Sequence, residues 1–189
     1  MRLFFAVNLP PHVLDHVVEV RDAVRAALGE DGIRWLQADQ FHYTLKFLGE
    51  LPPRRAHGAA EAVQQLAKDV RPFSLTLGGV GAFPNPQRAS VVWLGAAEGA
   101  EPLVALAERL DRTLAGRGFR RERQPLKPHL TIARIKGYAG ETSVARRLPE
   151  LEVNRIATFT VESIALMQSV LSPAGSTYSL VETFPLSAE

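Results

Sequence analysis

The sequence contains no cysteine among its 189 residues, which excludes disulfide bonds and thiolate chemistry. This absence favours reducing surroundings, so the protein is predicted to be cytoplasmic. No apolar run approaches the length of a membrane span, and the apolar start, residues 3–7, is too short for the core of a signal peptide. The sequence therefore predicts a globular protein without a membrane partner.

Two common cofactor signatures are also missing. No G-x-x-x-x-G-K-S/T segment is present, so no P-loop supports the use of ATP, and no cluster of carboxylates suggests a pair of metal ions. We therefore expect neither a cofactor nor a metal. The net charge is only +2, which is too low for a protein that coats nucleic acid. Among the 22 basic residues 18 are arginine, which reflects either codon usage in a GC-rich genome or the recognition of phosphate.

Amphipathic helices and β-prone runs alternate along the chain. Apolar residues recur at helical spacing in three segments, over residues 11–28, about 55–69 and 102–116. Runs typical of strands lie before, between and after these helices. The predicted strands are Leu3 to Leu9, Phe41 to Leu48, Phe73 to Val80, Val91 to Leu94, His129 to Ala133, Ile156 to Gln168 and Thr177 to Phe184.

The order of these elements repeats when the chain is shifted by about 87 residues. A strand, a long helix, an H-x-T strand, a shorter helix and a further strand occur in each half. We therefore predict one α+β domain over residues 1–189, with an internal repeat of roughly 1–87 and 88–186. The expected architecture is bilobal: two pseudo-symmetric antiparallel β-sheet lobes, with helices on their outer faces and a cleft between them.

The H-x-T segments, His42-Tyr-Thr44 and His129-Leu-Thr131, are the residues most suggestive of chemistry. Because side chains alternate along a strand, each histidine shares a face with its threonine, while the apolar neighbours face the core. By the same alternation, Lys46 joins the face of His42, whereas Phe47 belongs to the core. A single H-x-T is more often structural, but two at equivalent places in a repeat predict a shared site.

Two facing imidazoles suit displacement at phosphorus. One ring can take a proton from the attacking water or hydroxyl, and the other can give a proton to the leaving oxygen. A phosphate between them would accept hydrogen bonds from the hydroxyl groups of Thr44 and Thr131. The other histidines, His12, His16 and His57, lack this support and are expected at the surface. The pattern therefore predicts acid/base catalysis that needs no metal.

The two longer segments H-Y-T-L-K-F-L-G-E (residues 42–50) and K-P-H-L-T-I-A-R (residues 127–134) resemble the paired signatures of the two-histidine phosphoesterases. More narrowly, they resemble the branch of RNA 2′,3′-cyclic phosphodiesterases, also called 2′-5′ RNA ligases. The opening R-L-F-F-A-V-N-L-P, the I-R-W-L before the first signature and the turn G-V-G-A-F-P-N-P are also similar to this branch. The resemblance covers nearly the whole chain.

This resemblance implies hydrolysis of a terminal 2′,3′-cyclic phosphate to a 2′-phosphate, and a capacity for the reverse, ATP-independent joining to a 5′-hydroxyl. It implies His42, Thr44, His129 and Thr131 as catalytic residues, with His42 as the acid toward O3′ and His129 as the base toward water. Lys46 and Arg134 match basic positions of the signatures that contact phosphate. Strict alternation places Arg134 opposite His129, so it reaches the cleft only if the strand twists or ends there.

The expected partner is RNA with a 2′,3′-cyclic phosphate end or a cyclic nucleotide, bound by a monomer. Three further arginines, Arg120, Arg121 and Arg123, lie in a basic segment before His129 and are candidates to track the RNA backbone, the alternative being a solvated loop. Trp35 and Phe83 are candidates to stack on a base or, alternatively, pack in the core.

Two other functions are consistent with the same residues. One is a nucleotide- or RNA-binding module that does not hydrolyse its ligand. The other is a related phosphoesterase that trims another RNA end or opens a cyclic ADP-ribose phosphate. Turnover of a cyclic nucleotide would distinguish an enzyme from a binding module. The residues that form the walls of the pocket determine which substrate a phosphoesterase accepts.

Overall fold

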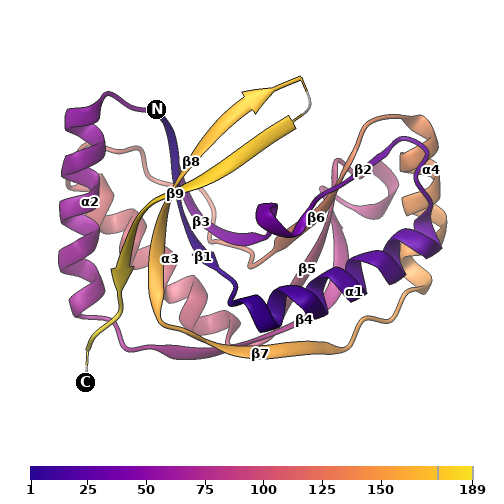
Figure 1. Cartoon of the computed structure of the whole chain (residues 1–189), viewed down its shortest axis with the longest axis horizontal. Coiled ribbons are helices and arrows are strands. Elements are labelled where there is room, and N and C mark those ends of the chain that lie inside the picture. The colour runs from indigo at the N-terminus through magenta and orange to yellow at the C-terminus, as the bar shows by residue number, and fades with distance from the viewer. Residues whose placement is uncertain (174, 189) are drawn as a thin grey trace.

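A computed structural model describes residues 1–173 and 175–188 (Figure 1). The helices are α1 (Pro11–Leu28), α2 (Pro53–Lys68), α3 (Ala100–Ala115) and α4 (Tyr138–Arg147). The strands are β1 (Arg2–Asn8), β2 (Ile33–Trp35), β3 (His42–Glu50), β4 (Phe73–Phe83), β5 (Val91–Glu98), β6 (Leu130–Ile135), β7 (Arg155–Val161), β8 (Ser163–Ser172) and β9 (Gly175–Pro185). Among the described residues, no helix combines the length and apolarity needed to cross a membrane.

The strands form one curled antiparallel sheet in the order β7-β4-β5-β6-β3-β1-β8-β9, with β2 paired to β6. Helices α2 and α3 pack together at one end of the molecule, and α1 and α4 lie at the other (Figure 1). The predicted α+β class, with antiparallel strands and helices outside them, is confirmed.

The two H-x-T strands meet at the centre of this sheet. Strand β3 and strand β6 are joined by one registered pair, Tyr43 opposite Leu130. Each of these residues is the middle residue of an H-x-T segment, and each is buried. The connection between the strand groups β3-β1-β8-β9 and β7-β4-β5-β6 therefore lies directly beneath the histidines and threonines.

The long helices do not pack on the strands that precede them in the chain. Helix α1 follows β1 but contacts β7 and α4, and helix α3 follows β5 but contacts β3 and α2. The chain segments 1–87 and 88–186 therefore each contribute to both ends of the sheet. Their equivalence as an internal repeat stays a prediction.

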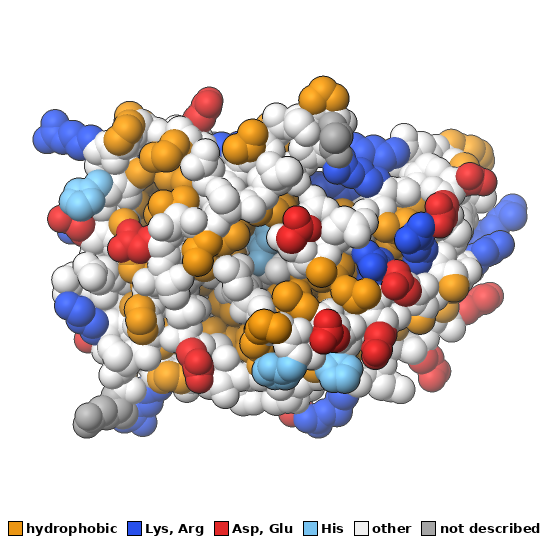
Figure 2. All heavy atoms as spheres, in the orientation of Figure 1, with side chains coloured by type: hydrophobic (Ala, Val, Ile, Leu, Met, Phe, Trp, Pro, Cys, Tyr) orange, Lys and Arg blue, Asp and Glu red, His pale blue; other side chains and the backbone are white. Residues whose placement is uncertain are grey.

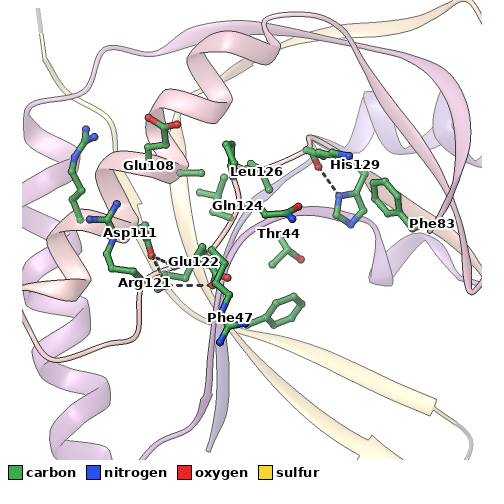
Figure 3. A pocket seen from close by; sticks show the side chains of 17 residues that line it. Thr44, Phe47, Phe83, Glu108, Asp111, Arg121, Glu122, Gln124, Leu126 and His129 are labelled. Atoms are coloured by element: carbon green, nitrogen blue, oxygen red, sulfur yellow. Dashed lines mark hydrogen bonds and ion pairs between the residues drawn. The ribbon is translucent and has the colours of Figure 1, made fainter. Parts of the chain in front are cut away.

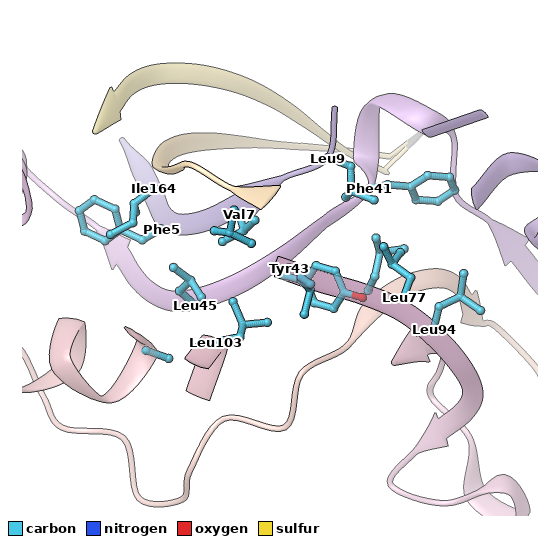
Figure 4. Packing of buried hydrophobic residues seen from close by; sticks show 14 of the residues in the cluster. Phe5, Val7, Leu9, Phe41, Tyr43, Leu45, Leu77, Leu94, Leu103 and Ile164 are labelled. Atoms are coloured by element: carbon cyan, nitrogen blue, oxygen red, sulfur yellow. The ribbon is translucent and has the colours of Figure 1, made fainter. Parts of the chain in front are cut away.

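The buried helix faces follow the apolar periodicity closely. The apolar residues at helical spacing are all buried on α2 (Ala59, Val63, Leu66 and Ala67) and on α3 (Leu103, Leu106, Ala107, Leu110 and Leu114). Helix α1 differs at one step: its apolar spacing places Val20 toward the core, yet Val20 is only half-buried and the neighbouring Arg21 is buried. The core continues under the H-x-T strands, where the Tyr43 hydroxyl donates to the Gly95 carbonyl at 2.8 Å and Leu45 lies near Leu103 of α3 (Figure 4).

Three features of the secondary structure differ from the predictions. The single strand predicted over residues 156–168 is two strands, β7 and β8, which break at Glu162 and lie in different groups of the sheet. Strand β2 was missed because three residues carry no periodicity. Helix α4 is not among the three predicted helical segments, because its buried face consists only of Gly140 and Val144 and shows little amphipathic pattern; only the repeat indicates a shorter helix after the second H-x-T strand.

Candidate active site

The four H-x-T side chains share one wall of a cleft. Tyr43 and Leu130 pair in an antiparallel ladder and point into the core. The residues on either side of each therefore project from the other face of the sheet. These flanking residues are His42 and Thr44 on one strand and His129 and Thr131 on the other. All four line one cavity of about 360 Å³, here called the histidine cavity. The structure therefore brings the four predicted catalytic residues together.

Each imidazole is held by backbone two residues earlier. The Nδ1 atom of His129 lies 2.7 Å from the carbonyl oxygen of Lys127 (Figure 3). A carbonyl only accepts, so Nδ1 carries the proton and Nε2 is left to react. His42 likewise makes a backbone hydrogen bond with Gln40, which favours its protonated form. The two rings are thus oriented by the same local device.

The surroundings of His42 keep its ring neutral. The pKa of His42 is lowered to about 4, mainly because burial disfavours the charged ring. The backbone hydrogen bond with Gln40 raises the pKa, whereas the charges of His129 and Arg134 lower it. The imidazole packs against two aromatic rings. Its centroid lies 4.8 Å from that of Phe4 and 5.0 Å from that of Tyr178, which it meets edge-on. At neutral pH the unliganded protein therefore presents His42 without its second proton.

A β-bulge in β3 overturns the predicted faces of Lys46 and Phe47. Thr44 pairs with Ala6 and Lys46 with Phe5, so Leu45 has no partner of its own in β1. An extra residue of this kind moves the following side chains to the other face. Lys46 is consequently buried on the side of α3, whereas Phe47 is 64% exposed and lines the histidine cavity. The prediction that Lys46 shares the face of His42 is wrong.

A second bulge, in β6, brings Arg134 to the cleft. Thr131 pairs with Trp93 and Ala133 with Val92, which leaves Ile132 unpaired in that ladder. The side chain of Arg134 therefore returns to the face of Thr131, where it is exposed and lines the histidine cavity. Strict alternation had placed it on the opposite face. Basic side chains also gather near the tip of the β8–β9 hairpin in Figure 2.

The predicted contact of Lys46 with phosphate competes with contacts inside the protein. Its ammonium donates to Asp111 at 2.6 Å, to the carbonyl of Arg120 at 2.9 Å and to Glu122 at 3.3 Å. Only 2% of the side chain is exposed. All three hydrogens of the ammonium thus have acceptors within the protein.

The predicted RNA-binding arginines lie in the loop between α3 and β6, residues 116–129. This loop forms one wall of a second cavity of about 560 Å³, here called the loop cavity (Figure 3). Arg121 and Arg123 line it, and Arg120 lies in an adjoining depression. The loop cavity and the histidine cavity share Thr44, Phe47 and His129, so they meet at the wall that holds the H-x-T residues.

Of the two aromatic residues predicted as candidates for base stacking, one lies in the core and the other in the cleft. Trp35 is 9% exposed and its indole N–H donates to the Gly29 carbonyl at 3.0 Å, so it is a core residue. Phe83 lines the loop cavity and meets the ring of His129 edge-on at 4.9 Å. Three further aromatic residues line the histidine cavity, Phe4, Phe47 and Tyr178, and the sequence predicts none of them there. Phe47 was assigned to the core by alternation, and no motif marks Tyr178 in the C-terminal strand.

Within residues 1–173 and 175–188, no group of three or more His, Asp or Glu residues is arranged to hold a metal ion. The side chains of His16 and His57 are 56% and 76% exposed, as the sequence predicted for both.

The fold and the cleft define a protein class in which two central antiparallel strands each supply a histidine and a threonine. The chain belongs to the 2′-5′ RNA ligase superfamily, whose family model matches residues 9–172. The family predicted from the two signatures is therefore confirmed.

Relatives and solved structures agree with this assignment. An RNA 2′,3′-cyclic phosphodiesterase of Methanothermobacter thermautotrophicus is 33% identical, over 98% of this chain and 99% of that one. One of Thermus thermophilus is 35% identical, over 100% of this chain and 92% of that one. The crystal structure of TT0787 of Thermus thermophilus has a TM-score of 0.81 at 33% identity, with both chains fully covered. Escherichia coli LigT complexed with 3′-AMP has a TM-score of 0.77 at 24% identity, over 98% and 97% of the two chains, and supports the fold alone.

Proposed function

We propose that this protein is an RNA 2′,3′-cyclic phosphodiesterase that converts a terminal 2′,3′-cyclic phosphate into a 2′-phosphate. The observation that carries the proposal is the pair of imidazoles, His42 and His129, each oriented by backbone and placed with a threonine on one wall of the histidine cavity. The names of the relatives support the same substrate.

The reaction uses the pair as base and acid. A water oxygen attacks phosphorus while one imidazole takes its proton, and the bond from phosphorus to O3′ breaks as the other imidazole protonates the leaving oxygen. Hydroxyl groups of Thr44 and Thr131 donate to the non-bridging oxygens, and Arg134 offsets their negative charge. Run in reverse with a 5′-hydroxyl as nucleophile, the same arrangement joins two RNA ends without ATP.

Several finer points belong to this proposal. The reaction is taken to need no metal or other cofactor, since the two imidazoles supply both proton transfers. We also propose a monomer that works in the cytoplasm, as the absence of cysteine suggested.

The test is turnover of 2′,3′-cyclic AMP, followed by ³¹P NMR to identify the 2′-phosphate. His42→Ala and His129→Ala are each expected to lower kcat by about 10² to 10⁴, the usual contribution of a general acid or base. His57→Ala, which removes an exposed imidazole, serves as the matched control. A strong chelator is expected to leave the wild-type rate unchanged. Near-wild-type turnover by either catalytic variant would refute the mechanism.

The same variants assign the two roles. The resemblance makes His42 the acid, yet the low pKa of its ring means that it must first take up a proton as the anionic phosphate binds. A substrate with sulfur in place of O3′ needs little help from an acid, because a thiolate leaves readily. His42→Ala is therefore expected to recover most of its rate on this substrate, and His129→Ala is not. Recovery by His129→Ala alone would exchange the roles.

A further inference from the structure

A buried carboxylate ties the α3–β6 loop to the catalytic strand. Asp111 of α3 accepts hydrogen bonds from the Lys46 ammonium at 2.6 Å, from the Glu122 amide at 3.1 Å and from the Arg121 guanidinium at 2.5 Å. Burial alone would raise the pKa of Asp111, but the donors outweigh it, Lys46 and Arg121 most of all, and the pKa is lowered. The charged carboxylate therefore holds strand, helix and loop together.

Lys46 fastens the same loop from the strand. Besides Asp111, its ammonium donates to the carbonyl of Arg120 and to the side chain of Glu122. Successive loop residues 120, 121 and 122 are thus each held by Lys46 or Asp111. Earlier in the loop, Arg55 of α2 donates to the Gly118 carbonyl at 3.2 Å and lies over the ring of Phe119.

The fastened segment is the wall of the loop cavity and ends at the catalytic histidine. Arg121, Glu122 and Gln124 line the loop cavity together with Thr44 and Phe47 (Figure 3). Further along the same segment, the carbonyl of Lys127 accepts the Nδ1 proton of His129. The position of residues 120–122 therefore sets where the basic wall stands relative to the scissile phosphate.

The fold does not require an ion pair at this place. Two buried charges lose their hydration, and their replacement by apolar residues of similar size is often neutral for stability. The sequence elsewhere fills helix–strand contacts with apolar residues, and the residue of β6 that corresponds to Lys46 at the offset of 87 is Ala133. The buried pair is therefore better explained by what it holds than by the stability it adds.

We propose that Lys46 and Asp111 are positioning residues that set the selectivity of the cleft for RNA over a cyclic mononucleotide, by fixing residues 120–122 in the basic wall of the loop cavity. The inference rests on the proposed function for its substrate. Its structural part, that the pair fixes the loop, stands independently. An RNA chain presents further phosphates to this wall, whereas a mononucleotide ends at the catalytic residues.

The experiment compares wild type with the double variant Lys46→Met/Asp111→Leu, which removes both charges and keeps their volume. The control variant Glu98→Gln/Arg155→Gln removes an exposed ion pair between β5 and β7. Asp111→Asn is the second variant: it preserves the shape of the side chain but turns one acceptor oxygen into a donor that faces other donors. It remains informative if the double variant does not fold.

The first readout is the loop itself. The segment carries trypsin sites after Arg120, Arg121 and Arg123, so limited trypsin digestion of the folded protein, with fragments identified by mass, reports its release. We expect cleavage there to be about tenfold faster in the double variant than in wild type, with an unchanged rate in the control. A comparable thermal midpoint excludes global unfolding as the cause. Equal cleavage rates in all three proteins would overturn the proposal.

The second readout is the ratio of kcat/KM for an RNA oligonucleotide with a 2′,3′-cyclic phosphate end to that for 2′,3′-cyclic AMP. We expect the ratio to fall about tenfold, through a higher KM for the oligonucleotide, while kcat for cyclic AMP stays within about twofold. Equal losses on both substrates would show that the pair supports the site as a whole, and would overturn the selectivity role. If wild type hydrolyses neither substrate, the proposed function fails, and the trypsin result still judges the loop.

Discussion

The ring of His42 gives a quantitative test that does not depend on any substrate. In the folded protein its pKa is about 4, and in the unfolded chain a histidine has a pKa near 6.5. Below pH 6.5 the unfolded chain therefore binds a proton that the folded protein excludes. The free energy of unfolding must fall as the pH decreases from about 6.5 to about 4, and this loss ends once both states are protonated.

The magnitude follows from the size of the pKa difference. One excluded proton changes the free energy of unfolding by at most about 1.4 kcal/mol per pH unit, and by about half of that at pH 6.5, so roughly 1.6 kcal/mol is lost between pH 6.5 and 5.0. The ring still borders a cavity, so solvent reduces this value somewhat. In His42→Asn this contribution is absent. The difference in stability between wild type and the variant is therefore expected to shift by 1 to 2 kcal/mol, roughly, over that range.

Urea unfolding followed by tryptophan fluorescence at pH 7.0, 6.0 and 5.0 measures this difference. His57→Asn provides the comparison, since the imidazole that it removes is 76% exposed. The expected result is a shallower pH dependence for His42→Asn than for both other proteins. Parallel curves for all three would show that the folded protein protonates His42 as readily as the unfolded chain, and the neutral His42 inferred from burial would be refuted.

The remaining predictions concern the positive charges of the cleft. Arg134→Gln is expected to lower kcat/KM for 2′,3′-cyclic AMP by about 10- to 100-fold, the value of a hydrogen bond to a charged group, and an unchanged kcat/KM would place the phosphate elsewhere. Arg120→Ala/Arg123→Ala spares the Arg121 contact with Asp111, and is expected to flatten the salt dependence of RNA binding by about 1.4 units if both residues contact a single strand. An unchanged slope in a fluorescence anisotropy titration would mean that RNA leaves the cleft by another path.

Most of the secondary structure could be predicted because long periodic segments determine it. The stripe that includes Leu103, Leu106 and Leu110 predicts both helix α3 and its buried face, and the structure agrees. The boundary at Glu162 could not be predicted in this way. Residues on both sides of it have high strand propensity, and only their different pairing partners, β4 for β7 and β1 for β8, separate the two strands.

The motif residues and their neighbours differ in how far the sequence could place them. Alternation over two residues correctly puts His42 with Thr44 and His129 with Thr131, because no irregularity lies between them. Beyond the threonines it fails, since both bulges begin at the next residue. A bulge depends on the register of the neighbouring strand, here β1 for β3 and β5 for β6, and that register is not encoded locally in the H-x-T strand.

These two bulges also explain how two strands with the same H-x-T motif build an asymmetric cleft. Each lies directly after the threonine, so the second residue beyond the threonine turns toward the helices and the third turns into the cavity. The third residue is Phe47 on β3 and Arg134 on β6, an aromatic ring on one strand and a cation on the other. The second is Lys46, which fastens the α3–β6 loop, and Ala133, which has no charge with which to do so. The same backbone irregularity therefore leaves the two histidines and two threonines together while it places different side chains of the two strands in the histidine cavity. A substrate whose two sides differ, a phosphate with a nucleoside on one side and a solvent nucleophile on the other, needs that difference.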